Sequence, residues 1–153
     1  MLEPSVRLLS LFCMGLAAGI TLCVLLTERH WTGSARFYTE LKQLWIRVLT
    51  VPGPALGAVA LVAMVVDAYL LFTRGIALAC GLVVTAVVLN VAAMVLTKVG
   101  HFPINDRIRS WDPAHPPENW SAVRARWSAL HAGRTACAVG SFTLLLLGSV
   151  LVG

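Results

Sequence analysis

The sequence predicts an all-α membrane protein, a bundle of four transmembrane helices with an amphipathic interfacial helix in the first connection. Hydrophobic residues make up 58% of the 153 positions and charged residues only 12%, whereas a soluble domain carries about 25% charged residues. The mean hydropathy is +0.81. The apolar residues also gather in four runs, each near the roughly 20 residues that cross a hydrocarbon core. We therefore expect the bilayer to be the solvent of this chain.

The four runs follow one another with short connections, which predicts a single membrane domain over residues 1–153. The first run follows Arg7 and is longer than the apolar segment of about 7–15 residues found in secretion signals, so we predict a helix there. The last run carries no charge from Thr135 onward and continues a helix that begins near Trp120. The predicted spans are residues 8–26, 51–72, 76–96 and 120–152.

The first connection has the pattern of an amphipathic helix. Apolar and aromatic residues recur there every three or four positions, with charged and amide residues between them. This pattern predicts a helix over residues 34–49 that lies along the boundary between lipid and water. Pro52 and Pro54 follow it and suit the opening turn of the second span.

Lysine and arginine residues are concentrated in the first and third connections, and Arg7 and Arg74 lie on the other side. By the positive-inside rule, these two connections face the cytoplasm of a cell membrane and both termini lie outside. The net charge of +5 then reflects this topology. No nucleic-acid-binding motif accompanies the charge, so no nucleic-acid partner is predicted. A homo-oligomer is compatible with the sequence.

Five residues of the last helix form a polar and aromatic stripe. On a helix that turns by about 100° per residue, steps of four, three, four and three residues keep side chains on one face. Anchoring at the membrane boundary explains any one of these residues, but the alignment of all five favours one wall of a site. The stripe consists of Trp120, Arg124, Trp127, His131 and Arg134.

Other polar residues extend the candidate site. The third connection, which includes Asn105 and Trp111, is interpreted either as a lid or as a solvated loop. A carboxylate at membrane depth costs about 2.5–3.5 kcal/mol on insertion scales, so Asp67 is expected to pair with Arg74 or with an arginine of the last helix. The alternative is that Asp67 is only hydrated, because it lies near the end of its span. Asn90 is interpreted either as a hydrogen bond between helices or as a substrate contact.

A metal site is a further interpretation. Glu28, His30, His101 and His131 are all predicted on the cytoplasmic side, and carboxylate and imidazole ligands suit iron or copper. No HxxxH or ExxH pair joins them, and the four cysteines form no CxxC pair. Such a site would therefore need residues from separate segments to converge.

One more pattern extends across the third connection and the last helix. It comprises Pro103, Ile104, Asn105, Arg107, Trp111, Pro117, Trp120, Arg124, Arg126, Trp127, His131 and Arg134, with a leucine-rich span after it. This stretch resembles the anthrone-oxygenase-like family of small four-helix membrane proteins, most closely over residues 103–150. The segment Glu28-Arg29-His30-Trp31 is more charged than the corresponding segment of that family.

The resemblance implies an oxygenase that acts on a lipophilic, aromatic polyketide-like molecule of secondary metabolism at the cytoplasmic membrane interface. Family members assigned to anthrone oxygenation use dioxygen without a flavin, haem or metal, so no cofactor is predicted. An anthrone has an acidic C–H bond because its enolate is aromatic, and the electron-rich anion reacts with dioxygen directly. The protein must then remove a proton and hold an anion.

The resemblance also suggests roles for the residues of the stripe. His131 is the candidate base, because imidazole titrates at about pH 6.5 when unperturbed. Arg124 and Arg134 lie on either side of it along the helix and would stabilise the oxyanion. Flat or hydrogen-bonding side chains would bind the substrate, and these are Trp127, Trp120, Asn105, Asp67, Asn90 and Trp111.

Two other functions remain as alternatives. One is a metal-dependent membrane oxidase that holds iron or copper with the histidine and glutamate ligands named above. The other is a small transporter or a non-catalytic membrane binding protein. Transport predicts polar residues near the middle of the bilayer in several spans. In this sequence they concentrate at one interface, which favours an interfacial site.

Overall fold

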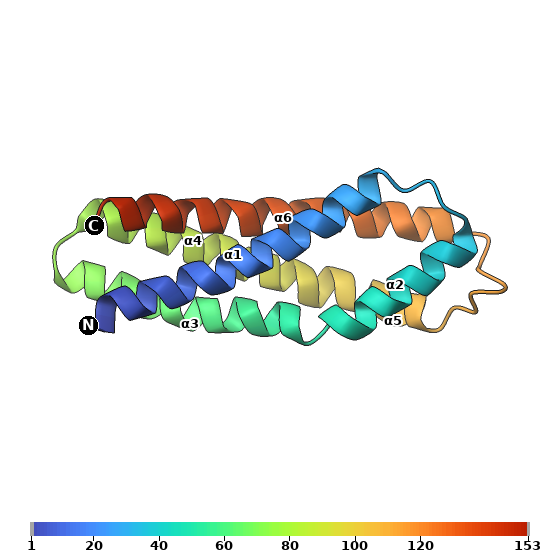
Figure 1. Ribbon diagram of the computed structural model, residues 1–153, viewed down its shortest axis with the longest axis horizontal. Coiled ribbons are helices and arrows are strands. Elements are labelled where there is room, and N and C mark those ends of the chain that lie inside the picture. Colours follow the sequence, from blue (N-terminus) through green and yellow to red (C-terminus); the bar gives the residue numbers. More distant parts are fainter. Residues whose placement is uncertain (1, 153) are drawn as a thin grey trace.

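The computed structural model describes residues 2–152, and throughout that part of the chain the regular structure is helical. Four helices are long and apolar enough to cross a membrane, which confirms the predicted fold class. Figure 1 shows them running along the long axis of the molecule, with both ends of the chain at the same end of the bundle. The elements are α1 (Leu2–Arg29), α2 (Ala35–Leu49), α3 (Pro52–Thr73), α4 (Ala77–Val95), η1 (Leu96–His101), α5 (Phe102–Arg109) and α6 (Trp120–Val150).

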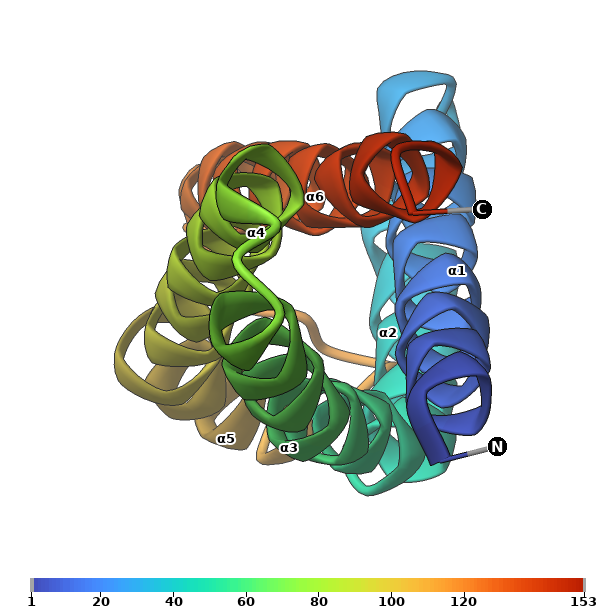
Figure 2. The same ribbon diagram turned by 90° about the vertical axis from the view of Figure 1, so that its left-hand side faces the viewer.

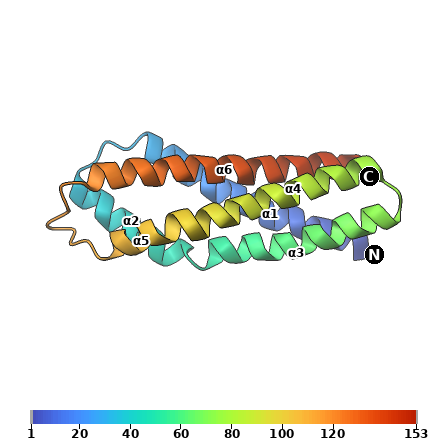
Figure 3. The ribbon, with the colours of Figure 1, turned by 180° about the vertical axis from the view of Figure 1, so that it is seen from behind.

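The long helices form a closed ring. Neighbouring pairs pack in the order α1 against α3, α3 against α4, α4 against α6 and α6 against α1, and Figure 2 shows this ring from the end that carries the termini. A tight turn joins α3 to α4 through Gly75, whose φ of +71° lies in the left-handed region that glycine adopts without strain. The opposite end of the ring is covered by α2 and α5, which Figure 3 shows from behind.

Helix α2 is the amphipathic helix predicted in the first connection. It begins at a hydrogen-bonding cap, in which the Ser34 side chain accepts from the backbone N–H of Phe37. Tyr38 and Ile46 are buried on its inner face, while Phe37, Leu44 and Val48 are exposed on the outer one. The helix ends beside Pro52, which opens α3 at a position where a missing N–H does no harm. The chain therefore turns from α2 directly into a membrane-crossing helix.

The third long helix continues beyond the predicted span through a wide turn. Residues Leu96–His101 adopt π-helical geometry and lead into α5 without a break, although Gly100 and Pro103 suggest an interruption. Gly100 lies against α6, where an added Cβ would be 3.1 Å from Leu130 Cδ1. Single π-helical turns within α-helices occur frequently at functional sites, because the extra residue turns the side chains that follow onto a different face.

Two separate clusters form the core. The larger cluster fills the ring toward the termini with small and apolar side chains such as Ala60, Met64 and Val83. The second lies where α2 and α5 cover the ring, and it is rich in aromatic residues, among them Tyr38 and Trp127. Small residues let helices approach closely, and they are frequent in the first cluster, whereas large aromatic rings fill much of the second.

Asp67 is neutralised by a different residue from the two predicted. The carboxylate is 1% exposed and pairs with Arg7 of α1 at 3.1 Å, rather than with Arg74 or an arginine of α6. Arg74 instead pairs with Glu3 at 2.5 Å. Both ion pairs join α1 to α3 or to the turn that follows it, near the termini. Asp67 thus serves the packing of the bundle at the end opposite α2 and α5.

Candidate functional site

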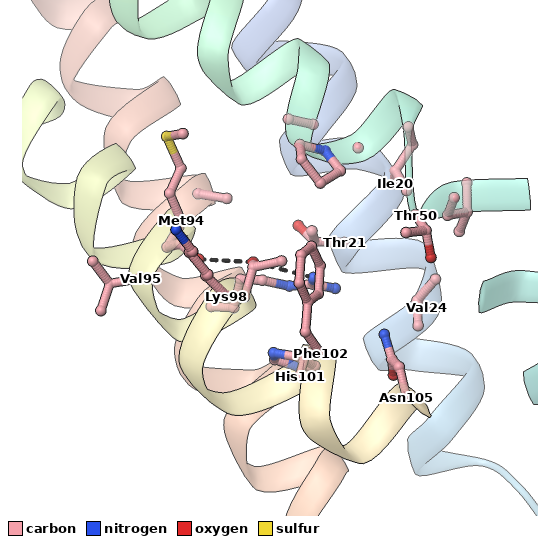
Figure 4. Close-up of a pocket in the computed structure, with 18 of the residues that line it drawn as sticks. Ile20, Thr21, Val24, Thr50, Met94, Val95, Lys98, His101, Phe102 and Asn105 are labelled. Carbon is pink, nitrogen blue, oxygen red and sulfur yellow. Dashed lines mark hydrogen bonds between the residues drawn. The ribbon is translucent and has the colours of Figure 1, made fainter. Parts of the chain in front are cut away.

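A cavity of about 480 Å³ lies inside the end of the bundle that α2 and α5 cover. Its wall is mainly apolar and includes residues from each of the long helices as well as α2, η1 and α5. In Figure 4, Thr21 and Val24 of α1 line one part of it, and His101 and Asn105 line another. The volume lies in the range of about 300–1,000 Å³ that is typical of small-molecule sites. Polar side chains of the wall include Lys42, His101, Asn105 and Arg134.

His101 offers a free imidazole nitrogen at this wall. Its Nδ1 lies 3.1 Å from the carbonyl oxygen of Leu96 and must carry the proton to donate to it. Its Nε2 is then an acceptor, and this atom is buried without a hydrogen-bond partner. The residue is only 1% exposed. Buried polar atoms nearly always have partners, so an unpartnered Nε2 beside a cavity indicates a group available to a ligand.

His131 lies behind the wall and has no free nitrogen. It is fully buried, and its Nε2 donates to the backbone carbonyl of Thr21 at 2.9 Å. Its Nδ1 accepts from Nη2 of Arg134 at 2.8 Å, because an arginine can only donate. Both ring nitrogens are therefore engaged, and His131 does not line the cavity. This geometry leaves His131 no free nitrogen for the predicted role of base, and it places the ring where it accepts a hydrogen bond from Arg134.

Arg134 brings a positive charge to the cavity without a carboxylate beside it. One side of its guanidinium is held by His131, and Nη1 lies 3.4 Å from the hydroxyl of Thr97. Its Nε is buried without a partner. Within residues 2–152 no ion pair includes Arg134. A buried charge is normally paired, so this guanidinium is suited to a negatively charged group of a ligand.

Arg124 belongs to a separate ionic cluster around Glu28. The Glu28 carboxylate is paired with Lys42 and also lies 3.4 Å from Nε of Arg124 and 3.2 Å from the hydroxyl of Ser128. Arg124 further donates from Nη2 to the Glu28 carbonyl at 2.8 Å. Lys42 is 2% exposed, and its Nζ lies 3.3 Å from the ring centre of Trp127. Lys42, unlike Arg124, therefore lines the cavity and brings a buried cation to its wall.

Trp127 and Asn105 meet in the cavity wall, whereas two other predicted aromatic residues lie outside it. The indole N–H of Trp127 donates to Oδ1 of Asn105 at 2.9 Å, and the ring stacks on His131 with centroids 4.6 Å apart. Trp120 packs against Tyr38, and Trp111 is buried in the aromatic cluster. Neither lines the cavity, so their contribution is to pack the surrounding helices.

Two predicted substrate contacts lie elsewhere in the bundle. Asp67 is paired with Arg7 near the termini. Asn90 donates from its side-chain amide to the backbone carbonyl of Gly57 at 3.0 Å, so it joins α4 to α3. Neither residue lines the cavity. Of the two interpretations of Asn90, the structure supports the hydrogen bond between helices.

The third connection continues from α5 as an exposed loop. Its Asp112 carboxylate accepts a hydrogen bond from Nδ1 of His115 at 2.8 Å, and both side chains are more than half exposed. This hydrogen bond, with one from the backbone of Ala114, lowers the pKa of Asp112 below its usual value. No residue from 110 to 119 lines the cavity. These observations favour the solvated loop over the lid.

The residues proposed as metal ligands do not converge. His101 and His131 lie close together, with ring centroids 5.9 Å apart. The Glu28 carboxylate is paired with Lys42 and Arg124, and the exposed His30, just after α1, is hydrogen-bonded to Leu26 of that helix. Within the described chain, no group of three or more histidine, cysteine or acidic side chains is placed to hold an ion. The predicted four-ligand set is therefore not assembled.

Two residues of the site were not assigned these roles from the sequence. Lys42 follows Tyr38 by four positions and precedes Trp45 by three, so it lies on the aromatic face of an amphipathic helix. A lysine on that face was the available signal for a buried cation. His101 was considered only as a metal ligand. Its position in the cavity wall follows a π-helical turn that the sequence pattern does not predict.

Comparison with known proteins agrees with the resemblance. A family model described as anthrone oxygenase matches residues 45–144, which is more than half of the chain. No curated protein and no solved structure matches significantly. The matched region runs from the end of α2 into α6 and therefore includes His101, Asn105, Trp127, His131 and Arg134. This chain belongs to the anthrone oxygenase family.

Proposed function

We propose that this protein is an integral membrane oxygenase that oxidises a lipophilic, anthrone-like aromatic molecule with dioxygen. The single observation that carries the proposal is the unpartnered Nε2 of His101, which lies in the wall of an apolar cavity shared with the Arg134 guanidinium. The family to which the chain belongs supports oxygenase chemistry. The apolar wall favours a flat, lipophilic substrate over a sugar or nucleotide.

In the proposed reaction His101 acts as the general base. Its Nε2 accepts a proton from the methylene carbon of the anthrone, and the electron pair of that C–H bond moves into the ring system to give an aromatic enolate. The negative charge develops on the carbonyl oxygen. Arg134 and Lys42 stabilise this charge in a surrounding of low dielectric constant, where such interactions are stronger than in water.

Dioxygen then oxidises the enolate. The carbanion carbon forms a bond to oxygen, and the resulting peroxide takes up the proton held by His101. Loss of water from this hydroperoxide converts the former methylene into a carbonyl, so CH2 and O2 yield C=O and H2O. The four electrons that reduce dioxygen come from the two C–H bonds of the methylene group. The proposal therefore requires no flavin, haem or metal, and iron or copper would add chemistry that these steps do not use.

Replacement of the proposed base tests this function. We expect His101→Gln to lower kcat on anthrone by about 100-fold or more, which is the usual contribution of a general base. The measurement is dioxygen uptake and quinone formation by purified protein in lipid nanodiscs. His30→Gln is the matched control, because His30 is an exposed histidine outside the cavity. Full activity of the His101 variant would remove the proposed base.

We also propose that the first and third connections face the cytoplasm, since the basic residues of the chain concentrate there. The cavity lies at the same end of the bundle as these connections. A single cysteine placed at the exposed His115 should then react with a membrane-impermeant maleimide only after the cell membrane is opened. Labelling in intact cells would indicate the reverse orientation.

A further inference from the structure

The cavity is closed toward the end of the bundle that carries α2 and α5. The Gln43 side chain of α2 donates to the carbonyl oxygens of Ile108 and Trp111, at 3.0 and 2.9 Å. At the end of α2, Nη2 of Arg109 donates to the hydroxyl of Thr50 at 3.1 Å. Ile108 is fully buried beneath this crossing. Hydrogen bonds and packed apolar groups therefore separate the cavity from the water beyond the bundle.

The exposed residues of the cavity wall belong to α4 and η1, which indicates an opening on that side, next to the start of α3. Val91, Val95 and Val99 recur at intervals of four residues, and all three line the cavity. They are also 41%, 53% and 72% exposed. Across from this row the wall includes Gly53 and Pro54. An added Cβ on Gly53 would meet nothing within 4 Å, so no side chain narrows the opening from that position.

The surroundings of this side opening are those of a lipid-facing surface. The three valines lie in the segment Ala77–Arg109, which is long and apolar enough to cross a membrane. Exposed valines are costly in water but not among acyl chains. Lys98 is exposed on the same rim, and a lysine near the end of a span extends its amine toward the headgroups while its stem stays in the hydrocarbon. The opening thus reaches from acyl-chain depth to the headgroup boundary.

We infer that the ligand enters this cavity sideways from the bilayer, through an opening between the row Val91, Val95 and Val99 and the start of α3 at Gly53 and Pro54. The occupant is a neutral aromatic molecule dissolved in the membrane. A molecule that enters from the lipid does not have to pass through water. Its concentration at the opening is then its concentration in the bilayer, which partitioning from water into lipid makes high. The inference rests on the proposed function only for the aromatic character of the ligand.

Reversible blockage of the opening tests this route. In a background with the four native cysteines replaced by alanine, Val95→Cys places a thiol on the rim. Val88→Cys is the matched control, because Val88 is 61% exposed on the same helix but does not line the cavity. Each variant, in phosphatidylcholine nanodiscs, is modified with a bulky benzyl methanethiosulfonate and later restored with a reductant. Benzophenone dissolved in the lipid is then photoactivated, and its attachment to Ile46 and Trp127 of the inner wall is quantified by mass spectrometry.

We expect blockage at Val95→Cys to lower the labelling of Ile46 and Trp127 at least tenfold, with full recovery after reduction and no loss at Val88→Cys. Recovery in the same sample excludes misfolding as the cause. Unchanged labelling of the inner wall in blocked Val95→Cys would overturn the inference, and so would an equal loss in the control. The readout needs no turnover, so a protein that admits benzophenone in this way but does not oxidise anthrone would refute the proposed function and leave the route intact.

Discussion

At the scale of single residues, two neighbouring histidines differ because different atoms are left for them to bond. His131 lies between a carbonyl of α1 and the Arg134 guanidinium, so neither of its nitrogens is free. His101 bonds within its own helix through Nδ1 and keeps Nε2 unpartnered. The sequence predicts both residues on the same side of the membrane but does not show which backbone carbonyl each will bond to. The division of roles follows from packing alone.

His131 is expected to act on catalysis through Arg134. His131→Ala should lower kcat by about 10-fold, because the guanidinium loses the acceptor that holds it, and His131→Gln should recover part of this loss. The pH dependence of kcat distinguishes the roles of the two histidines. The fall of kcat at low pH, where the base is protonated, should persist in the His131 variants and disappear in His101→Gln. A His131 variant whose pH profile matches that of His101→Gln would show that His131 is the base.

Lys42 is expected to contribute to stability as well as to the cavity. Lys42→Met leaves the buried Glu28 carboxylate with Arg124 at 3.4 Å as its remaining cation, and loss of one partner of a buried pair costs about 3–5 kcal/mol. The free energy of unfolding in mild detergent measures this effect. Arg36→Met is the control, because its pair with Glu40 is exposed and worth about 0–1 kcal/mol. Adding Glu28→Gln to Lys42→Met should recover much of the loss, and a further loss would contradict the pairing.

At the scale of elements, the π-helical turn η1 determines which face of the third helix meets the cavity. Hydrophobic periodicity predicts a continuous α-helix here. The same kind of pattern predicted the membrane spans, the amphipathic helix and the stripe on α6. Hydrophobic periodicity does not reveal the wide turn of η1, in which Gly100 lies against Leu130 of α6. For this reason the position of His101 in the cavity wall could not be predicted, whereas the stripe on α6 indicated positions in that wall for Trp127 and Arg134.

The contact between η1 and α6 is expected to be sensitive to added volume. Gly100→Val introduces atoms where even a Cβ would be 3.1 Å from Leu130, and such overpacking typically costs about 1–3 kcal/mol. We expect a lower melting temperature and a kcat reduced by 10-fold or more, because His101 follows directly. Leu130→Ala in the same chain should restore part of both. Gly81→Val, at a position with no neighbour within 4 Å, should leave kcat within twofold.

At the scale of the whole molecule, the two ends of the bundle differ in how they pack and in which residues they contain. Near the termini, small residues pack tightly and the buried Asp67–Arg7 pair joins α1 to α3. At the other end, large aromatic rings surround the cavity, whose wall includes the cations Lys42, Lys98 and Arg134. Composition predicts the four helices, but it does not show that Asp67 pairs with Arg7, because residues 60 positions apart meet only once the ring has closed.

Asp67 is therefore expected to matter for stability and not for catalysis. Arg7→Ala should lower the free energy of unfolding by about 3–5 kcal/mol, because it leaves a buried carboxylate unpaired, and Asp67→Asn should cost less. In both variants kcat/KM of the protein that remains folded should stay within twofold of the parent. Unfolding in detergent and dioxygen uptake in nanodiscs provide the two measurements. A selective loss of kcat/KM would indicate that this end of the bundle takes part in the reaction.

The position of Lys42 over Trp127 gives the molecule a built-in optical reporter. A full positive charge 3.3 Å from the centre of an indole ring alters the energy of its excited state, and Trp127 and Trp45 are the tryptophans that line the cavity. A guest that draws the ammonium group away, or that stacks on the ring itself, must change the colour and intensity of the emitted light. Occupancy can then be followed in the unmodified protein, without a dye.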